Sequence, residues 1–176
     1  MENVIIEQLV KYSPTKEDRK RRYIYLIITA IFVFIWLNLP NVIAVIFMEV
    51  LTVVCAALLM NFFLNKEYEY TFVDGEIDID VIYNRSRRRR VFTGSVQEFE
   101  IIAHFTDRAN LDFYKNYKLK DFSGGTVSDN TYVFVASYKG KKSRIVIEPN
   151  DKLLEAMRQY TVPSKFFKLN KSEDSL

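Results

Sequence analysis

The sequence contains one cysteine and one histidine among its 176 residues. Cys55 alone cannot form a disulfide within the chain or build a cysteine-based metal cluster. His104 alone leaves the usual zinc sites and hydrolase triads without their parts. No nucleophile, base and orienting group can be assembled from the residue types present. We therefore expect no metal ion, no cofactor and no enzymatic activity.

Charge is nearly absent from two long stretches. Residues 23–39 carry no charged side chain, and residues 42–64 carry only Glu49. At about 1.5 Å per residue, helices over these stretches reach about 25 and 35 Å, against a bilayer hydrocarbon core of about 30 Å. The sequence thus predicts a transmembrane helical hairpin over residues 23–64, with spans at 23–39 and 42–64 and a tight turn at residues 38–41.

Basic residues flank only the outer ends of this predicted hairpin, and the turn carries no charge. Lys66 follows the hairpin, and the residues that precede it are Lys16, Arg19, Lys20, Arg21 and Arg22. The positive-inside rule then places both termini in the cytoplasm. We expect a multi-pass protein of the cytoplasmic (inner) membrane, preceded by a cytoplasmic segment over residues 1–22.

Glu49 is the one ionisable group inside the predicted spans, about 12 Å from the turn at about 1.5 Å per residue. Thr29 on the facing span is its nearest polar candidate. Such a carboxyl group is costly in a bilayer when charged. It can be a protonated group bonded within the hairpin, a polar contact between protomers, or part of a proton or ion path.

The first residues predict a short amphipathic helix over residues 1–12, with Val4, Ile5 and Leu9 near one face. Residues 13–15 break this pattern. Thr15 with Asp18 three residues later is a loose capping signature for the helix that follows.

Beyond residue 65 the hydrophobic period changes from helical to alternating, and Asp74-Gly75 supplies a two-residue hairpin turn. The patterns predict about seven strands, at residues 67–72, 76–83, 88–93, 96–103 with a bulge at 94–95, 117–122, 131–138 and 143–148. A helix capped by Asn150 and ended by Pro163 follows them. These elements predict an antiparallel barrel or sandwich over residues 65–163, closed by a helix, and a polar tail over 164–176.

Two stretches carry a resemblance to a known fold: EYTFVDGEIDI at residues 69–79 and IVIEPNDKLLE at residues 145–155. Seven strands and a C-terminal helix resemble the pleckstrin-homology (PH) superfold. The whole chain resembles an uncharacterised family of small bacterial two-span membrane proteins with a C-terminal PH-like domain. The fold class implied is an α+β membrane protein, with a transmembrane hairpin followed by a PH-like barrel. PH-like folds host lipid binding, peptide binding and scaffolding, so the resemblance implies a binding module without choosing its ligand.

The densest charge run of the chain follows the second predicted strand. Its members are Arg85, Arg87, Arg88, Arg89 and Arg90. Asp78 and Asp80 can pair across to Arg88 or Arg90, but two acids leave a surplus of about three charges. This surplus can contact anionic lipid phosphates, at about 1 kcal/mol per basic residue, contact an acidic protein partner, or blunt a solvated strand edge. Nucleic acid is not expected, because no recognised module surrounds the run.

Two other features are weaker. Residues 123–126, SGGT, lack the spacing of a nucleotide loop and predict an ordinary loop. His104 near Asp107 is expected to be a surface histidine rather than part of an acid and base pair. The aromatic residues of the stretch 104–130 can cover the barrel or form a partner site, and the sequence does not choose.

The sequence as a whole predicts a non-catalytic, membrane-anchored binding or scaffold module. Its PH-like domain would engage a protein partner or a second copy, anionic lipid headgroups at the cytoplasmic leaflet, or both. The alternative is a subunit of a small oligomeric channel or transporter that uses Glu49.

Overall fold

The computed structural model describes residues 5–38, 42–63 and 66–167, without the side chains of residues 36, 42–43 and 59–63. The chain forms two compact units. One comprises residues 1–13 and 66–176, and the other comprises residues 14–65. The first unit is a two-sheet sandwich and the second is a helical hairpin.

The first sheet of the sandwich is an antiparallel meander in the order β1-β2-β3-β4. Its strands are β1 (Ile5–Lys11), β2 (Lys66–Val73), β3 (Glu76–Tyr83) and β4 (Arg87–Ser95). Asp74 and Gly75 have φ values of 47° and 93°, so the predicted turn between β2 and β3 is confirmed. β1 pairs with β2 where the sequence predicted a short helix, so that prediction is wrong.

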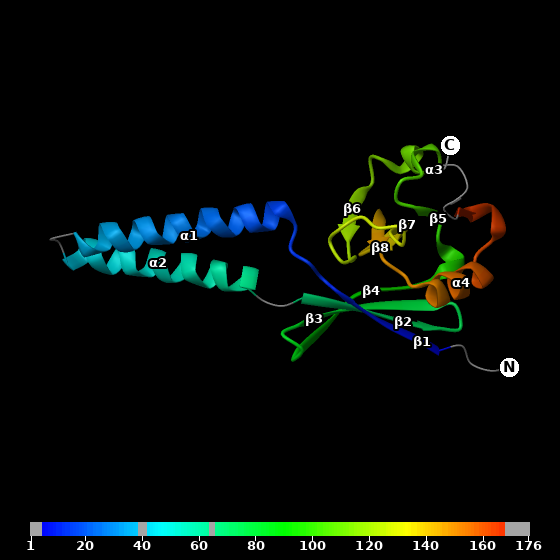
Figure 1. Ribbon diagram of the computed structural model, residues 1–176, viewed down its shortest axis with the longest axis horizontal. Coiled ribbons are helices and arrows are strands. Elements are labelled where there is room, and N and C mark those ends of the chain that lie inside the picture. Colours follow the sequence, from blue (N-terminus) through cyan, green and yellow to red (C-terminus); the bar gives the residue numbers. More distant parts are fainter. Residues whose placement is uncertain (1–4, 39–41, 64–65, 168–176) are drawn as a thin grey trace. The chain divides into compact units, whose positions relative to one another are not determined.

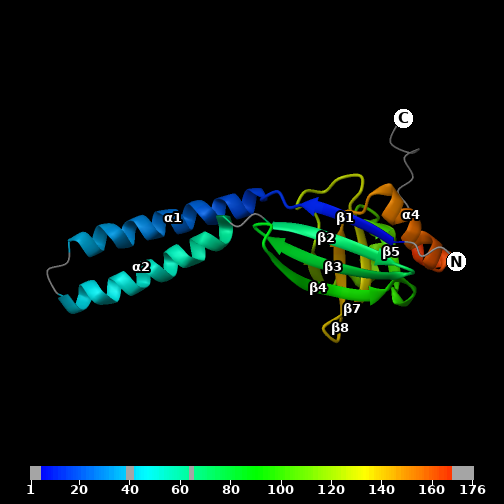
Figure 2. The ribbon, with the colours of Figure 1, turned by 90° about the horizontal axis from the view of Figure 1, so that it is seen from below.

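The second sheet has the order β6-β8-β7-β5-β9. Its strands are β5 (Ile101–His104), β6 (Lys118–Asp121), β7 (Tyr132–Tyr138), β8 (Lys141–Ile147) and β9 (Phe166–Phe167). β6 and β9 pair parallel with their neighbours, whereas the sequence predicted antiparallel strands throughout. The predicted strand 96–103 begins with a 3-10 turn, η1 (Val96–Glu98). The strands of one sheet run across those of the other in Figure 2.

A core of aromatic and branched side chains fills the space between the sheets. Phe99 and Phe134 stack in its middle with ring centroids 4.2 Å apart. Its largest fully buried members also include Tyr68, Tyr70, Phe72, Ile77, Ile79, Ile102, Ile145 and Ile147. The helix α4 (Asp151–Tyr160) adds Leu153 and Met157 to this core. Asn150 accepts a hydrogen bond from the N–H of Leu153 over 2.8 Å, which confirms it as the cap of α4.

The outer face of the second sheet is covered by α3 (Arg108–Leu111) and η2 (Asp112–Tyr114). Leu111 packs there against Val133, Val135 and Val146, with Phe105, Tyr114 and Tyr117 at the margin. Most of the aromatic residues in the stretch 104–130 therefore cover the sheet. Phe113 differs, because 82 % of it is exposed. The turn η3 (Pro163–Lys165) then leads from α4 to β9.

The helical hairpin consists of α1 (Lys16–Leu37) and α2 (Val42–Phe63). Thr15 and Asp18 form the predicted cap of α1, since the N–H and hydroxyl of Thr15 donate to the Asp18 carboxylate over 3.1 and 2.9 Å. The hairpin is inserted in the chain between β1 and β2, which are antiparallel neighbours. The sandwich is therefore built from both sides of the insertion.

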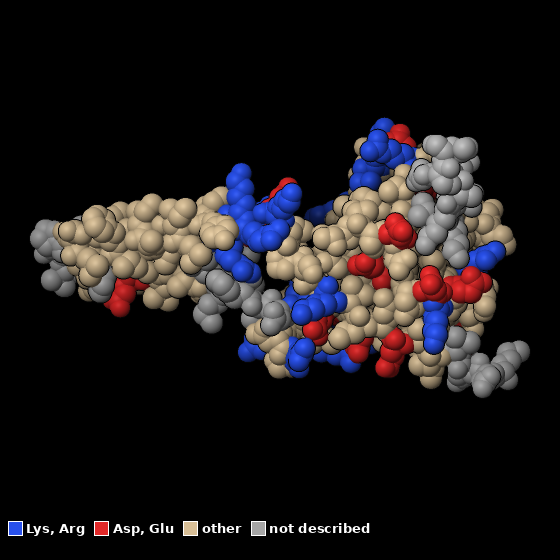
Figure 3. Space-filling model, in the orientation of Figure 1, with Lys and Arg blue, Asp and Glu red and all other residues tan. Residues whose placement is uncertain are grey.

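The predicted transmembrane hairpin is not supported. None of the helices, taken over its described residues, combines the length and the apolar composition that a membrane span requires. α1 opens with seven consecutive charged residues, visible as the charged end of the hairpin in Figure 3, so its uncharged part spans roughly 22 Å. α2 carries the charged residue Glu49 within its described part.

The predictions that rested on spanning helices are corrected with it. These are the membrane-protein fold class and the cytoplasmic-membrane location with both termini inside. What the structure shows is an α+β chain with two sheets and, among the described residues, four α-helices.

Candidate functional site

The five clustered arginines lie on and before β4, which is an edge strand of the first sheet. The turn from β3 to β4 places Asn84 and Arg85 at φ 48° and 56°, in the left-handed region. Such a turn brings β4 back beside β3, with Tyr83 opposite Arg87 and Val81 opposite Arg89. Side chains alternate along a strand, so the arginines divide between its two faces.

Arg88 and Arg90 lie on the outer face, where they form ion pairs with acidic side chains. The Nε of Arg88 donates to Asp80 over 2.6 Å, and its Nη2 contacts Glu69. The Nε of Arg90 donates to Asp80 over 3.3 Å, and its Nη2 lies 3.0 Å from Asp78. The predicted pairing of Asp78 and Asp80 with these two arginines is confirmed.

Asp80 is the centre of this arrangement because it is 4 % exposed and accepts from both arginines. Its hydrogen bond raises the pKa of the Arg88 guanidinium above its ordinary value, and the charge of Glu69 adds to the effect. A buried carboxylate requires such partners. The guanidinium groups of Arg88 and Arg90 are therefore engaged in ion pairs within the first sheet.

Arg87 and Arg89 lie on the opposite face of β4. Among the described residues, no acidic group lies within ion-pair distance of either, and both are exposed. Arg85 has only a 3.9 Å contact with Glu67, and its side chain is 84 % exposed. The surplus of about three charges expected from the sequence is thus located on Arg85, Arg87 and Arg89.

The face that carries Arg87 and Arg89 continues across the sheet into aromatic and basic side chains. Tyr83 on β3 lies between Lys66 on β2 and Arg87 on β4. In the next row on the same face, Val81 on β3 lies between Tyr68 on β2 and Arg89 on β4. Opposed residues share a face of the sheet. The Nζ of Lys66 lies 4.7 Å from the ring centroids of both Tyr12 and Tyr68, as a cation–π contact.

A series of ring contacts connects this row to the second sheet. Tyr68 contacts Phe122 with centroids 5.7 Å apart, and Phe122 contacts Tyr138 at 6.1 Å. Lys120 and Lys139 place their Nζ atoms 5.2 and 5.5 Å from the Tyr138 ring. We call this set the basic end of the sandwich, and its members are Lys66, Arg87, Arg89, Lys120 and Lys139.

A shallow pocket of about 190 Å³ adjoins the basic end, between β4 and the β7–β8 turn. It is lined by residues 90–93 of β4 and by Ser137, Tyr138 and Lys139. The basic end thus offers several cations and tyrosine rings over an open surface. Sequence reasoning found its two arginines but not its three lysines, because they come from three separate segments of the chain.

Glu49 and Thr29 are not joined in the hairpin. The hydroxyl of Thr29 donates to the carbonyl of Tyr25 in its own helix over 2.8 Å. Glu49 is exposed on α2 beside Ile46, Val50 and Val53. The described residues hold no hydrogen bond between the two groups, and they hold no cluster of three or more potential metal ligands.

Residues 123–126 lie outside the helices and strands, as expected, and Glu148 holds them. Its carboxylate accepts from the N–H of Gly124 over 3.1 Å and from the hydroxyl of Ser128 over 2.7 Å. An acidic group at this position makes a phosphate site unsuitable, because it repels the ligand's charge.

His104 was expected at the surface and is buried instead, with 4 % exposed. Its ring contacts Tyr132 on β7, and its Nδ1 lies 2.8 Å from the hydroxyl of Thr106. Asp107 accepts from the N–H and the side-chain amide of Asn110, so its carboxylate caps α3. The two residues do not form an acid and base pair.

Three comparisons relate this chain to known proteins, and one of them gives a match. A search of curated proteins and a search of solved structures each found no match. A family model described as "Bacterial PH-like domain (DUF6106)" matches residues 2–168, a range that includes β1, the helical hairpin and the rest of the sandwich. The chain therefore belongs to this bacterial PH-like domain family.

Proposed function

We propose that the protein is a non-catalytic binding module whose basic end binds anionic lipid headgroups. Membership of the bacterial PH-like domain family supports a binding or scaffold role, because PH-like folds host lipid binding, peptide binding and scaffolding. The observation that supports an anionic ligand is the difference in ion pairing between the arginines of β4. Arg88 and Arg90 are neutralised by the sheet, whereas Arg87 and Arg89 are exposed and lack an ion pair among the described residues.

The shape and charge of the basic end suit a surface rich in phosphate. Five cations from three strands and a turn make up the basic end, beside a pocket of only about 190 Å³. Each basic residue near an anionic surface contributes about 1 kcal/mol, and salt weakens the contribution. Tyrosine rings beside the lysines supply groups that combine an apolar ring with a polar hydroxyl.

An acidic protein partner is the second candidate, because β4 is an edge strand. The groove between residues 90–93 and the β7–β8 turn lies along that edge. An extended acidic segment can add to such an edge through backbone hydrogen bonds. The cations of the basic end would then favour a segment that carries negative charge.

Co-sedimentation of the full-length protein with vesicles tests the lipid proposal. Neutral phosphatidylcholine vesicles measure adsorption through the exposed apolar side chains of α1 and α2. Vesicles containing phosphatidylglycerol add the anionic charge. We expect tighter binding to the anionic vesicles, reduced by added salt. Equal binding to both vesicles, together with binding to an acidic peptide, would favour the protein partner.

A further inference from the structure

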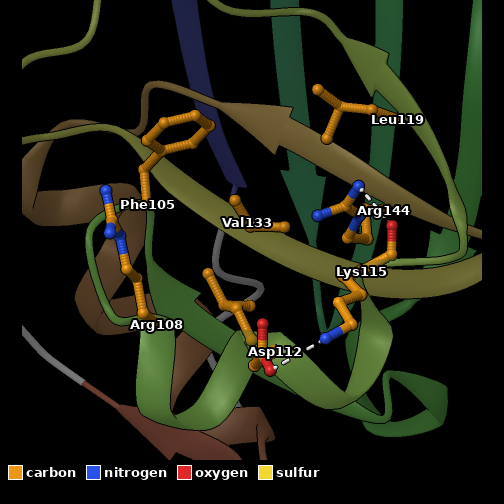
Figure 4. A pocket seen from close by; sticks show the side chains of 8 residues that line it. Phe105, Arg108, Asp112, Lys115, Leu119, Val133 and Arg144 are labelled. Atoms are coloured by element: carbon orange, nitrogen blue, oxygen red, sulfur yellow. Dashed lines mark hydrogen bonds and ion pairs between the residues drawn. The ribbon is translucent and has the colours of Figure 1, made fainter.

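A second pocket lies on the outer face of the second sheet, apart from the basic end. It has a volume of about 360 Å³ and lies between the α3–η2 segment and strands β6, β7 and β8. This volume lies within the range of small-molecule sites, about 300–1,000 Å³. Figure 4 shows the side chains that line it: Phe105, Arg108, Leu111, Asp112, Lys115, Leu119, Val133 and Arg144.

Half of this lining is apolar. Leu111 and Val133 are buried members of the small core under α3, and Phe105 packs against the same core. Leu119 is 46 % exposed. An apolar surface beside an open pocket favours a ligand with a hydrocarbon or aromatic body.

The other half of the lining is predominantly basic. Lys115 forms an ion pair with Asp112 over 3.2 Å, so these two charges offset each other. Arg108 and Arg144 remain, and they stand on opposite sides of Val133 in Figure 4. The pocket therefore presents two guanidinium groups around an apolar floor.

Arg144 is held in place by backbone groups. Its Nε donates to the carbonyl of Tyr117 over 3.3 Å, and its Nη2 donates to the carbonyl of Lys115 over 2.9 Å. These bonds fix the plane of the guanidinium and leave Nη1 for another acceptor. A fixed guanidinium loses little side-chain entropy when it binds a carboxylate.

We propose that this pocket binds an apolar carboxylate, with the carboxylate between Arg108 and Arg144 and the apolar body over Leu111, Leu119 and Val133. The carboxylate belongs either to a free organic acid or to the C-terminus of a peptide with apolar last residues. The site is independent of the basic end and goes beyond the proposed headgroup binding.

Titration calorimetry of the full-length protein with phenylbutanoate tests this proposal, with phenylbutanamide as the neutral probe of the same shape. The amide also measures adsorption to the exposed apolar side chains of the hairpin. We expect the acid to bind about tenfold or more tightly than the amide, as charge-assisted bonds to arginine require. Equal affinities for acid and amide, or no heat of binding at millimolar acid, would overturn the proposal.

Variants then assign the binding to this pocket. Arg108→Gln and Leu119→Glu alter exposed side chains, so the sandwich is expected to fold, and each should weaken acid binding about tenfold. Arg158→Gln on α4 makes the same charge change elsewhere and should leave the affinity unchanged. Unchanged acid binding in both pocket variants would contradict the assignment.

A pair of peptides identifies the source of the carboxylate. Both end in the same apolar residues, one with a free and one with an amidated C-terminus. Tighter binding of the free form than of phenylbutanoate indicates a peptide C-terminus. If phenylbutanoate binds and the peptide with the free C-terminus does not, the ligand is a free organic acid.

Discussion

The hydroxyl of Tyr70 donates to the carbonyl of Phe122 over 2.6 Å, at the centre of the sandwich. The same oxygen accepts from the N–H of Glu148 over 3.2 Å. One side chain of the first sheet thus satisfies two backbone groups near the second sheet. Burial raises the pKa of the Tyr70 hydroxyl far above its ordinary value, and burial also raises that of Tyr68.

These shifts predict loss of stability at alkaline pH. Both hydroxyls stay protonated in the folded state, whereas in the unfolded state they ionise near pH 10, so their stabilising contribution is complete below about pH 10 and is lost above it. Each tyrosine should lower the free energy of unfolding by about 1.4 kcal/mol per pH unit above 10. Urea unfolding between neutral and strongly alkaline pH measures this slope.

Tyr70→Phe should reduce that alkaline slope by about half, because it removes one of the two groups. At neutral pH it should cost about 1–3 kcal/mol, because the Phe122 carbonyl and the Glu148 N–H lose their partner. An alkaline slope equal to that of the unaltered protein would show that Tyr70 ionises alike in both states.

Gly75 and Gly140 form a matched pair of turn glycines with φ values of 93° and 76°. A Cβ on Gly75 would lie 2.7 Å from Cδ1 of Tyr160, whereas a Cβ on Gly140 would meet nothing within 4 Å. Gly140→Ala should cost about 1–2 kcal/mol for the left-handed backbone alone. Gly75→Ala should cost about 1–3 kcal/mol more, for the displaced ring. Equal losses in chemical denaturation would exclude close packing of Tyr160 on the turn.

Asp80→Asn should lower the free energy of unfolding by about 1–3 kcal/mol, because the buried carboxylate accepts from Arg88 and Arg90. The control is Asp112→Asn, which breaks an exposed pair with Lys115 and should change stability by less than about 1 kcal/mol. Thermal and urea unfolding of both variants provide the comparison. A loss no larger than the control's would mean that Asp80 does not anchor the arginines.

Glu148→Gln should loosen the loop over residues 123–128. The amide keeps one acceptor oxygen and loses the charge that strengthens the bonds from Gly124 and Ser128. Amide exchange at Gly124 should become about tenfold faster, as a loss of about 1.4 kcal/mol implies. Glu155→Gln, on the exposed face of α4, is the control and should leave this exchange unchanged.

Local signals in the sequence were sufficient for part of the fold. Asp74-Gly75 specifies its turn through its left-handed backbone conformation, and Asn150 specifies its helix cap through its side-chain hydrogen bond to the N–H of Leu153. The pairing of Asp80 with Arg88 followed from neighbouring strands of one hairpin. Interactions of this kind depend on residues close in the chain, so a pattern reveals them.

Features that depend on distant segments were missed. β1 has apolar side chains on both faces, with Ile5 and Leu9 exposed, and it pairs with β2 across the whole helical insertion. His104 is buried by Tyr132 of another strand. The lysines of the basic end likewise come from separate segments, and no local pattern brings them together.

The most direct test of the basic end compares two double variants in vesicle co-sedimentation. Arg87→Gln with Arg89→Gln removes the exposed arginines that lack an ion pair among the described residues, and Lys152→Gln with Arg158→Gln removes the same charge from α4. At about 1 kcal/mol per charge, the first variant should bind phosphatidylglycerol vesicles about tenfold or more weakly than the second. Equal binding of the two variants would contradict headgroup recognition by Arg87 and Arg89.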